Sequence, residues 1–127
     1  MRMTNTMNIL KSLFRGSKAI WEQKYLILRD FRLHIFQVQK DSSDYTKPFR
    51  VMELTENLSI KEIRKADIGG KAYVLEIIAN DKLPEKDRDM IHIACPGYET
   101  QNKWKRCLRN VKELYSQADK YKENYKT

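Results

Sequence analysis

The fold is decided by residues 90–115, MIHIACPGYETQNKWKRCLRNVKELY, because the spacing of hydrophobic residues changes within them. Residues 90–95 are rich in branched and small apolar side chains, which suit a β-strand. After a Pro-Gly pair, Trp104, Leu108 and Val111 recur at intervals of four and three residues and so lie on one stripe of a helix. The chain therefore passes from a strand into an amphipathic helix.

Upstream of this segment, the chain holds six further short runs of strand-like composition, separated by turn-forming residues. These runs are residues 8–14, 19–28, 33–38, 49–54, 58–63 and 72–78. The first run also fits a short amphipathic helix, since Met3, Met7, Leu10 and Phe14 follow a helical spacing. We favour a strand from about Asn8, because the runs that follow are clearly of the β type.

Seven short strands followed by one helix predict an α+β fold. A strongly bent antiparallel sheet, a partly open barrel, exposes an apolar face at its open end, and the C-terminal helix can cap that end. We expect residues 1–7 to form an N-terminal extension, residues 8–116 the domain, and residues 117–127 the end of the helix and a basic tail. The tail should fray from about Ser116.

Composition narrows the class of protein. A chain of 127 residues with 41% hydrophobic and 33% charged residues suits one globular domain. No apolar run approaches the roughly 20 residues of a membrane span, and the N-terminus does not read as a signal peptide, so we expect a cytoplasmic protein. Cys95 and Cys107 have no disulfide or metal-site spacing, which indicates reduced, buried thiols and neither metal nor cofactor.

The net charge of +8 is unevenly distributed along the chain. Residues 1–50 hold ten Lys/Arg against four Asp/Glu, and residues 101–127 hold eight against three. Residues 51–100 instead hold seven against ten. Such polarity orients a molecule in the field of an anionic surface, so both ends of the chain are candidates for an attracting face.

Three segments resemble the pleckstrin-homology (PH) family. Residues 21–28, WEQKYLIL, with 33–36, LHIF, are similar to its second and third strands, where the usual form is W-x-x-R-x-F-x-L and then L-x-x-F. Residues 56–63, ENLSIKEI, resemble the fourth and fifth strands of phosphoinositide-binding members of the general-receptor type. Trp104 stands where the family has a Trp on its C-terminal helix. We expect Trp21 and Trp104 to pack in the core.

The resemblance implies a binding site for phosphates at the first two strands. Lys11 matches the family's Lys on the first strand, and Lys24 matches the final Arg of the Lys/Arg-x-Arg pattern on the second. The middle position is Glu22, an acid in place of a base, which should repel a phosphate. Ile35 replaces the Tyr that helps to hold a 3-phosphate, although an alignment shift of one residue puts His34 there.

These departures favour a loose basic patch over a selective pocket. The candidate headgroup-binding residues are Lys11, Arg15, Lys18, Lys24, Lys40, Lys47 and Arg50. At roughly 1 kcal/mol for each basic residue near an anionic bilayer, four or five of them supply about 4 to 5 kcal/mol, which means weak binding. A second attachment is then needed, and insertion of Leu13 and Phe14 is one candidate.

The leading hypothesis is a non-enzymatic peripheral membrane module in signalling that recognises a phosphoinositide or phosphatidic acid through the basic face of the loop between the first two strands. The alternative is a protein-interaction or scaffold module without specific lipid binding, favoured by Glu22 and by the exposed helix.

The sequence contains no aromatic platform and no helix-turn-helix spacing, so it does not favour nucleic-acid binding. His34 and His92 lie in strand patterns without a nucleophile or carboxylate at a catalytic spacing, so we expect no enzyme.

Overall fold

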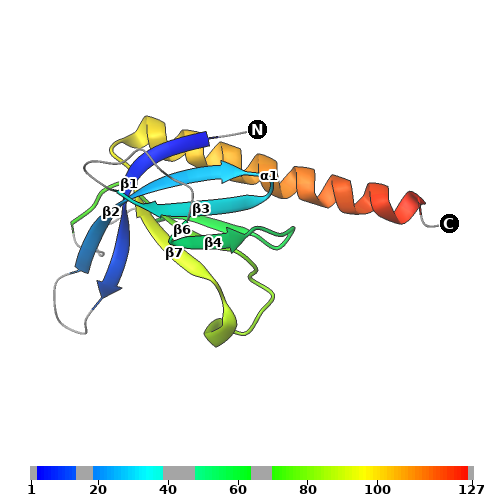
Figure 1. The fold of residues 1–127 in the computed structure, drawn as a ribbon, viewed down its shortest axis with the longest axis horizontal. Coiled ribbons are helices and arrows are strands. Elements are labelled where there is room, and N and C mark those ends of the chain that lie inside the picture. The colour runs from blue at the N-terminus through cyan, green and yellow to red at the C-terminus, as the bar shows by residue number, and fades with distance from the viewer. Residues whose placement is uncertain (1–2, 14–18, 39–47, 64–69, 126–127) are drawn as a thin grey trace.

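The computed structural model describes residues 3–13, 19–38, 48–63 and 70–125, apart from the side chains of residues 5, 11–13, 19 and 119–125. In these residues, the backbone forms one antiparallel sheet and a long C-terminal helix (Figure 1). The strands are β1 Met3–Leu13, β2 Ala19–Arg29, β3 Arg32–Gln37, β4 Arg50–Glu53, β5 Ser59–Ile63, β6 Val74–Ile78 and β7 Met90–Ala94. The helix is α1 Tyr98–Tyr125, and a short 3-10 helix, η1 Glu85–Asp87, precedes β7.

The sheet has the strand order β4-β3-β2-β1-β7-β6-β5, so β4 and β5 are its two edges and the barrel does not close. β1 joins the two halves, because it pairs with β2 along its length and with β7 at Asn8 and Ile9. Its register against β2 shifts between Leu10 and Ser12, an irregularity of the kind that bends a strand. The α+β fold with a bent sheet capped by one helix is confirmed.

The start of β1 differs from the sequence-based expectation. The strand begins at Met3, not near Asn8, so residues 3–7 belong to the sheet and not to an extension. Met3 pairs with Leu28 of β2, and both Met3 and Met7 are buried. The long partner strand β2 and the burial of the two methionines favour strand over helix here. The other six strands lie within two residues of their expected ends.

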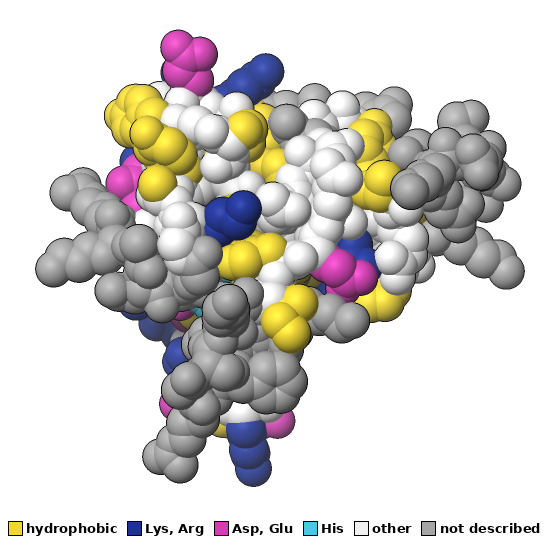
Figure 2. Space-filling view, turned by 90° about the vertical axis from the view of Figure 1, so that its left-hand side faces the viewer, with side chains coloured by type: hydrophobic (Ala, Val, Ile, Leu, Met, Phe, Trp, Pro, Cys, Tyr) yellow, Lys and Arg dark blue, Asp and Glu magenta, His cyan; other side chains and the backbone are white. Residues whose placement is uncertain are grey.

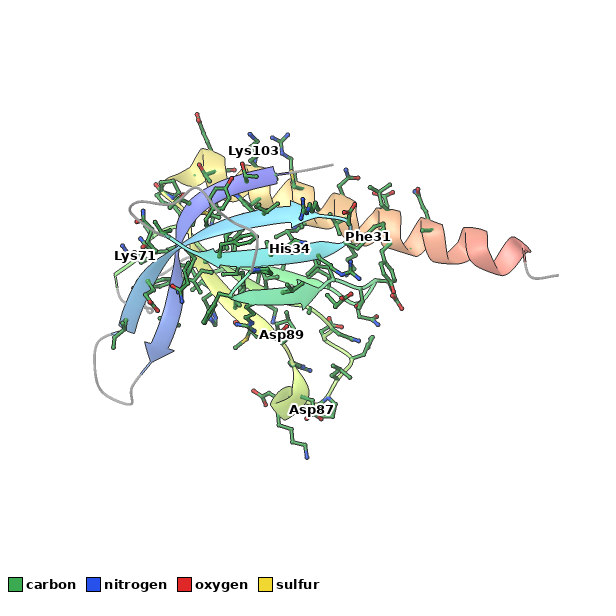
Figure 3. All side chains as sticks on the ribbon, in the orientation of Figure 1. Phe31, His34, Lys71, Asp87, Asp89 and Lys103 are labelled. Atoms are coloured by element: carbon green, nitrogen blue, oxygen red, sulfur yellow. The ribbon has the colours of Figure 1, made fainter. Side chains whose placement is uncertain are left out.

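A two-residue turn joins β2 to β3. Asp30 and Phe31 both have positive φ angles, 51° and 60°, as a hairpin turn of type I′ requires. This conformation is unfavourable for a bulky residue such as Phe31. The Phe31 ring packs edge-on against Tyr115 of α1, with 5.4 Å between the ring centroids (Figure 3). This contact stabilises the turn and attaches the far end of the hairpin to the helix.

The core lies between the concave face of the sheet and α1. Trp104, Leu108 and Val111 of the helix are buried, as their spacing predicts, and Trp104 is 0% exposed. They pack in one cluster with inward-facing strand residues such as Leu26 and Ile93. We expected the chain to fray from about Ser116, but the helix continues to Tyr125, and its last turns extend past the strands (Figure 1).

Candidate functional site

Lys24 is the centre of the site that the sequence predicts, and its ammonium group is enclosed. The side chain follows the inward alternation of Leu26 and Leu28 on β2 and is only 4% exposed. Its Nζ donates a hydrogen bond to Oε1 of Gln37 on β3 at 2.7 Å. The carboxylate of Glu22 lies 3.5 Å away. A buried ammonium requires such partners, because an isolated charge is costly to remove from water.

Phe49 completes the surroundings of Lys24. The ammonium lies 4.5 Å from the centroid of the Phe49 ring, within the range of a cation–π interaction. The backbone N–H of Phe49 donates to the carbonyl of Ile35 at 2.7 Å, which fixes the ring beside β3. The Phe49 side chain is otherwise 62% exposed. Lys24 is therefore held by an acid, an amide and an aromatic ring from three separate parts of the chain.

Arg50, the second described basic residue of the predicted site, is also paired. Its guanidinium binds the carboxylate of Asp89, labelled in Figure 3, and lies 3.4 Å from the carbonyl oxygen of Met90. Burial lowers the pKa of Arg50 below its usual value, although an arginine stays protonated. The ion pair joins the start of β4 to the residue before β7, although these two strands are not neighbours in the sheet.

The remaining predicted site residues cannot be placed as side chains. The backbone of Lys11 and Leu13 belongs to β1, but their side chains lie outside the described residues. Phe14, Arg15, Lys18, Lys40 and Lys47 also lie outside the described residues. The structure therefore brings Lys24 and Arg50 into the same region of the sheet, and the convergence of the other basic residues stays a prediction.

The two candidates for the missing 3-phosphate contact lie on opposite faces of β3. Ile35 is 2% exposed and packs in the core. His34 is half-buried on the outer face, stacked on Phe36 with 6.5 Å between the centroids (Figure 3). Burial, followed by the nearby charges of Arg29 and Arg32, lowers the pKa of His34. The side chain of Lys24, the buried cation of the predicted site, is on the inner face of the sheet, as is Ile35.

The two tryptophans differ in their surroundings. Trp104 packs in the core as expected, but Trp21 is only half-buried and is not part of the core cluster. The Nε1 atom of Trp21 is buried and has no hydrogen-bond acceptor among the described residues. Within the part of the chain that the structure describes, Trp21 is therefore neither a core residue nor anchored by a hydrogen bond of its ring nitrogen.

Other reactive groups show no catalytic arrangement in the described part of the chain. His92 forms a cross-strand contact with Glu76, at 3.1 Å between Nε2 and Oε2. Burial raises the pKa of the Cys95 thiol to about 12, which makes it a poor nucleophile, and Cys107 is half-buried. No group of three or more potential metal ligands gathers among these residues. No helix among them combines the length and hydrophobicity of a membrane span.

Figure 2 looks at the side of the molecule that lies at the left of Figure 1. The described Lys and Arg side chains on this side are scattered among acidic and hydrophobic ones and do not form one basic patch. Sequence patterns gave no sign of Gln37, Phe49 or Asp89 as partners of the predicted cations. These contacts join residues 13 to 39 positions apart, which no local pattern records.

Comparison with known proteins identifies the fold. No protein-family model and no curated protein matches the sequence. Three solved structures resemble the chain over most of its length: the PH domain of human KIAA0053 protein, the C-terminal PH domain of pleckstrin in complex with D-myo-Ins(1,2,3,5,6)P5, and the PH domain of ArhGAP27.

The first is 24% identical and covers 87% of this chain and 87% of its own, with a TM-score of 0.64. The second is 12% identical, with coverages of 87% and 93% and a TM-score of 0.63. The third is 14% identical, with coverages of 88% and 99% and a TM-score of 0.64. The chain therefore has a PH-like fold.

Proposed function

We propose that this domain is a non-enzymatic, cytoplasmic module that binds the anionic headgroup of a phosphoinositide or of phosphatidic acid through the basic face of the β1–β2 hairpin. The observation that carries this proposal is the excess of positive charge in the part of the chain that forms β1 to β3. Residues 1–50 hold ten Lys/Arg against four Asp/Glu. An anionic bilayer attracts such a segment at about 1 kcal/mol for each basic residue near its surface.

The fold is compatible with this function. One of the similar structures, the C-terminal PH domain of pleckstrin, was solved in complex with an inositol pentakisphosphate. At 12% identity this likeness concerns the fold, and the ligand is that protein's own. A PH-like fold also serves other partners, so the proposal depends on the charge of this chain and not on the fold alone.

The contacts of Lys24 indicate how a phosphate would compete. Lys24 already has Glu22 at 3.5 Å and Gln37 at 2.7 Å, and a dianionic phosphate must displace the carboxylate to reach the ammonium. Exchange of one anion for another gains less than binding to an unpaired cation. We therefore expect modest affinity, with most of the attraction coming from Lys11, Arg15 and Lys18, and with Lys40 and Lys47 as further contributors.

The same contacts favour a second candidate function, a PH-fold protein-interaction or scaffold module. Both described cations of the predicted site, Lys24 and Arg50, are satisfied by acids of the same chain. A surface whose cations are already paired suits a protein partner better than a phosphate. The two candidates differ in one measurable respect, because only the first requires that anionic lipid content controls binding to vesicles.

Co-sedimentation with vesicles tests the proposal. The vesicles contain phosphatidylcholine alone, or phosphatidylcholine with phosphatidylserine, phosphatidic acid or phosphatidylinositol bisphosphate at equal surface charge. We expect binding to the anionic vesicles only, and a preference among them identifies the headgroup. In the variant Lys11→Ala/Arg15→Ala/Lys18→Ala we expect about a 100-fold loss, which corresponds to about 1 kcal/mol for each charge removed.

A matched variant controls for net charge. Lys86→Ala/Lys103→Ala/Arg106→Ala removes the same charge from exposed positions on η1 and α1. We expect this variant to lose much less affinity than the first. Equal losses for the two variants, or binding that does not respond to anionic lipid, would contradict the proposal and favour the protein-interaction function.

A further inference from the structure

A groove between the edge strand β5 and the helix α1 lies away from the β1–β2 hairpin. It consists of three hollows of about 390, 370 and 250 Å³. Glu62 and Lys105 line both the first and the second hollow. Lys61 and Arg109 line both the second and the third. Neighbouring hollows therefore adjoin along the same two elements, and the ion pair of Glu62 with Lys105 spans the groove between the first hollow and the other two.

The two walls of this groove run alongside each other. The first hollow faces Tyr98 and Lys105 of α1, and the third faces Arg109 and Lys112, while on β5 the lining moves from Glu62 back to Ser59. Seven helical residues rise about 10 Å, and three strand residues also rise about 10 Å. A straight groove of this kind accommodates an extended chain of about three to four residues beside the strand.

The β5 wall is the free edge of the sheet. Within the described part of the chain, β5 pairs with β6 on one side and has no neighbouring strand on the other. An edge strand presents backbone N–H and C=O groups to the outside, where an added strand can pair with them. A peptide that lies in the groove in an extended conformation can therefore hydrogen-bond to β5.

The groove carries an excess of positive charge. Lys105 is neutralised by an ion pair with Glu62. Lys61 and Arg109 are exposed and Lys112 is half-buried, and the cations of these three residues face only one further acid of the lining, Asp81. Lys105, Arg109 and Lys112 recur at four and three residues, which places them on one stripe beside the buried Trp104 and Leu108.

We propose that this groove binds an extended acidic peptide segment of a partner protein, which adds a strand to β5 and directs its carboxylates toward Lys61, Arg109 and Lys112. Backbone pairing with β5 supplies the geometry, and the cations supply the preference for acidic side chains. A second copy of this chain is not the occupant, because pairing of two β5 edges would bring two sets of these cations together.

Fluorescence anisotropy with a defined probe tests this proposal. The probe is a fluorescein-labelled, acetylated and amidated peptide of alternating Glu and Val, and its counterpart has Lys in place of Glu. We expect the acidic peptide to bind at least about tenfold more tightly than the basic one. In amide spectra of the labelled protein, we expect the acidic peptide to shift signals of Ser59–Ile63 and of the facing part of α1.

A matched pair of protein variants locates the charge effect. Arg109→Glu/Lys112→Glu reverses two cations that line the groove, and Lys103→Glu/Arg106→Glu reverses two exposed cations on the other flank of the same helix, where Lys103 is labelled in Figure 3. Both variants have the same net charge, and circular dichroism checks that both fold. We expect the first variant to weaken peptide binding about tenfold or more, and the second much less.

Peptides with blocked amides test the strand pairing. N-methylation of every second residue removes the hydrogen-bond donors of one edge of the peptide and keeps its charge. Of the two possible versions, we expect one to bind about tenfold more weakly than the other, since only one edge meets β5. Equal binding of the two versions, equal effects of the two protein variants, or shifts confined to the β1–β2 hairpin would each overturn the proposal.

Discussion

At the scale of single residues, Glu22 places a negative charge beside Lys24, in the predicted phosphate site. Lys24 lies on the same face of β2 as the buried Leu26 and Leu28 and is itself 4% exposed, so its ammonium is removed from water. Glu22 and Gln37 compensate for this cost, and Glu22 does so by placing a negative charge where a phosphate would bind. The acid that stabilises the fold therefore competes with the proposed ligand.

Replacement of this acid should strengthen lipid binding. In Glu22→Gln the amide keeps a hydrogen-bonding group beside Lys24 and removes the competing charge, so we expect about a threefold to fivefold gain in affinity for anionic vesicles, the worth of one partly exposed ion pair. Glu53→Gln is the matched control: it removes the acid that pairs with Arg32, and it lies at the end of β4 away from Phe49 and Arg50. Equal gains in the two variants would show that net charge alone is responsible.

His34 should make stability depend on pH. Burial and the charges of Arg29 and Arg32 lower its pKa in the folded state, so the unfolded chain, with a histidine pKa of about 6.5, binds the proton first as the pH falls. The free energy of unfolding is therefore unaffected by His34 above about pH 6.5. It decreases as the pH falls below this value.

Urea unfolding of the native protein and of His34→Gln at pH values between about 7 and 5 measures this effect. We expect the stability of the native protein to fall more steeply than that of the variant over this range. Other groups titrate in both proteins and cancel in the comparison. Parallel stability curves would contradict the assigned role of His34.

At the scale of elements, alternation and helical spacing were enough to predict most of the fold. The predicted start of β1 was wrong because Met3 and Met7 also fit a helical spacing. Their place in the sheet depends on pairing with Leu28 and Lys24 of the partner strand. Fraying was expected from about Ser116 because the segment after Tyr115 is polar. It contains neither Gly nor Pro to stop a helix, so the helix continues to Tyr125.

The candidate site was less predictable than the fold. Matching of Lys24 to a family pattern predicted a cation that faces a phosphate, but besides Glu22 of the same strand its partners are Gln37 of β3 and Phe49, which precedes β4. Asp89, the partner of Arg50, is 39 residues away along the chain. Such pairs form only when the strands associate, and no local pattern contains them. The basic stripe of α1 was visible in the sequence, but its place beside a free edge was not.

The attachment of α1 to the sheet depends most on Trp104. This side chain is 0% exposed and packs in the cluster that joins helix and sheet. We expect Trp104→Ala to destabilise the domain by about 3 to 5 kcal/mol, measured by chemical denaturation, because the cavity cannot collapse fully. Trp21→Ala is the control, since Trp21 is half-buried and outside the cluster, and it should cost clearly less. The reverse order would contradict this assignment.

At the scale of the whole molecule, the two proposed surfaces belong to different parts of the sheet. The β1–β2 hairpin lies in the β1–β4 half, and the groove lies at β5, the last strand of the other half. Residues 51–100, which form β4 to β7, carry a small negative excess, and the positive excess of the chain comes from the segments before and after them. The two proposed sites therefore lie on separate parts of the sheet and do not overlap.

This distribution of charge predicts how lipid binding responds to salt. Screening shortens the reach of exposed charges from about 10 Å at 0.1 M salt to about 3 Å at 1 M, so attraction by a loose patch weakens steeply, whereas paired groups such as Lys24 and Glu22 are less affected. We expect the partition of the native protein onto anionic vesicles to fall steeply as sodium chloride is raised. The Lys11→Ala/Arg15→Ala/Lys18→Ala variant should show a clearly shallower dependence, because it lacks the charges that respond to screening. A slope that is the same for the two proteins would mean that the hairpin does not carry the attraction, and the membrane-facing surface would then have to be sought elsewhere on the domain.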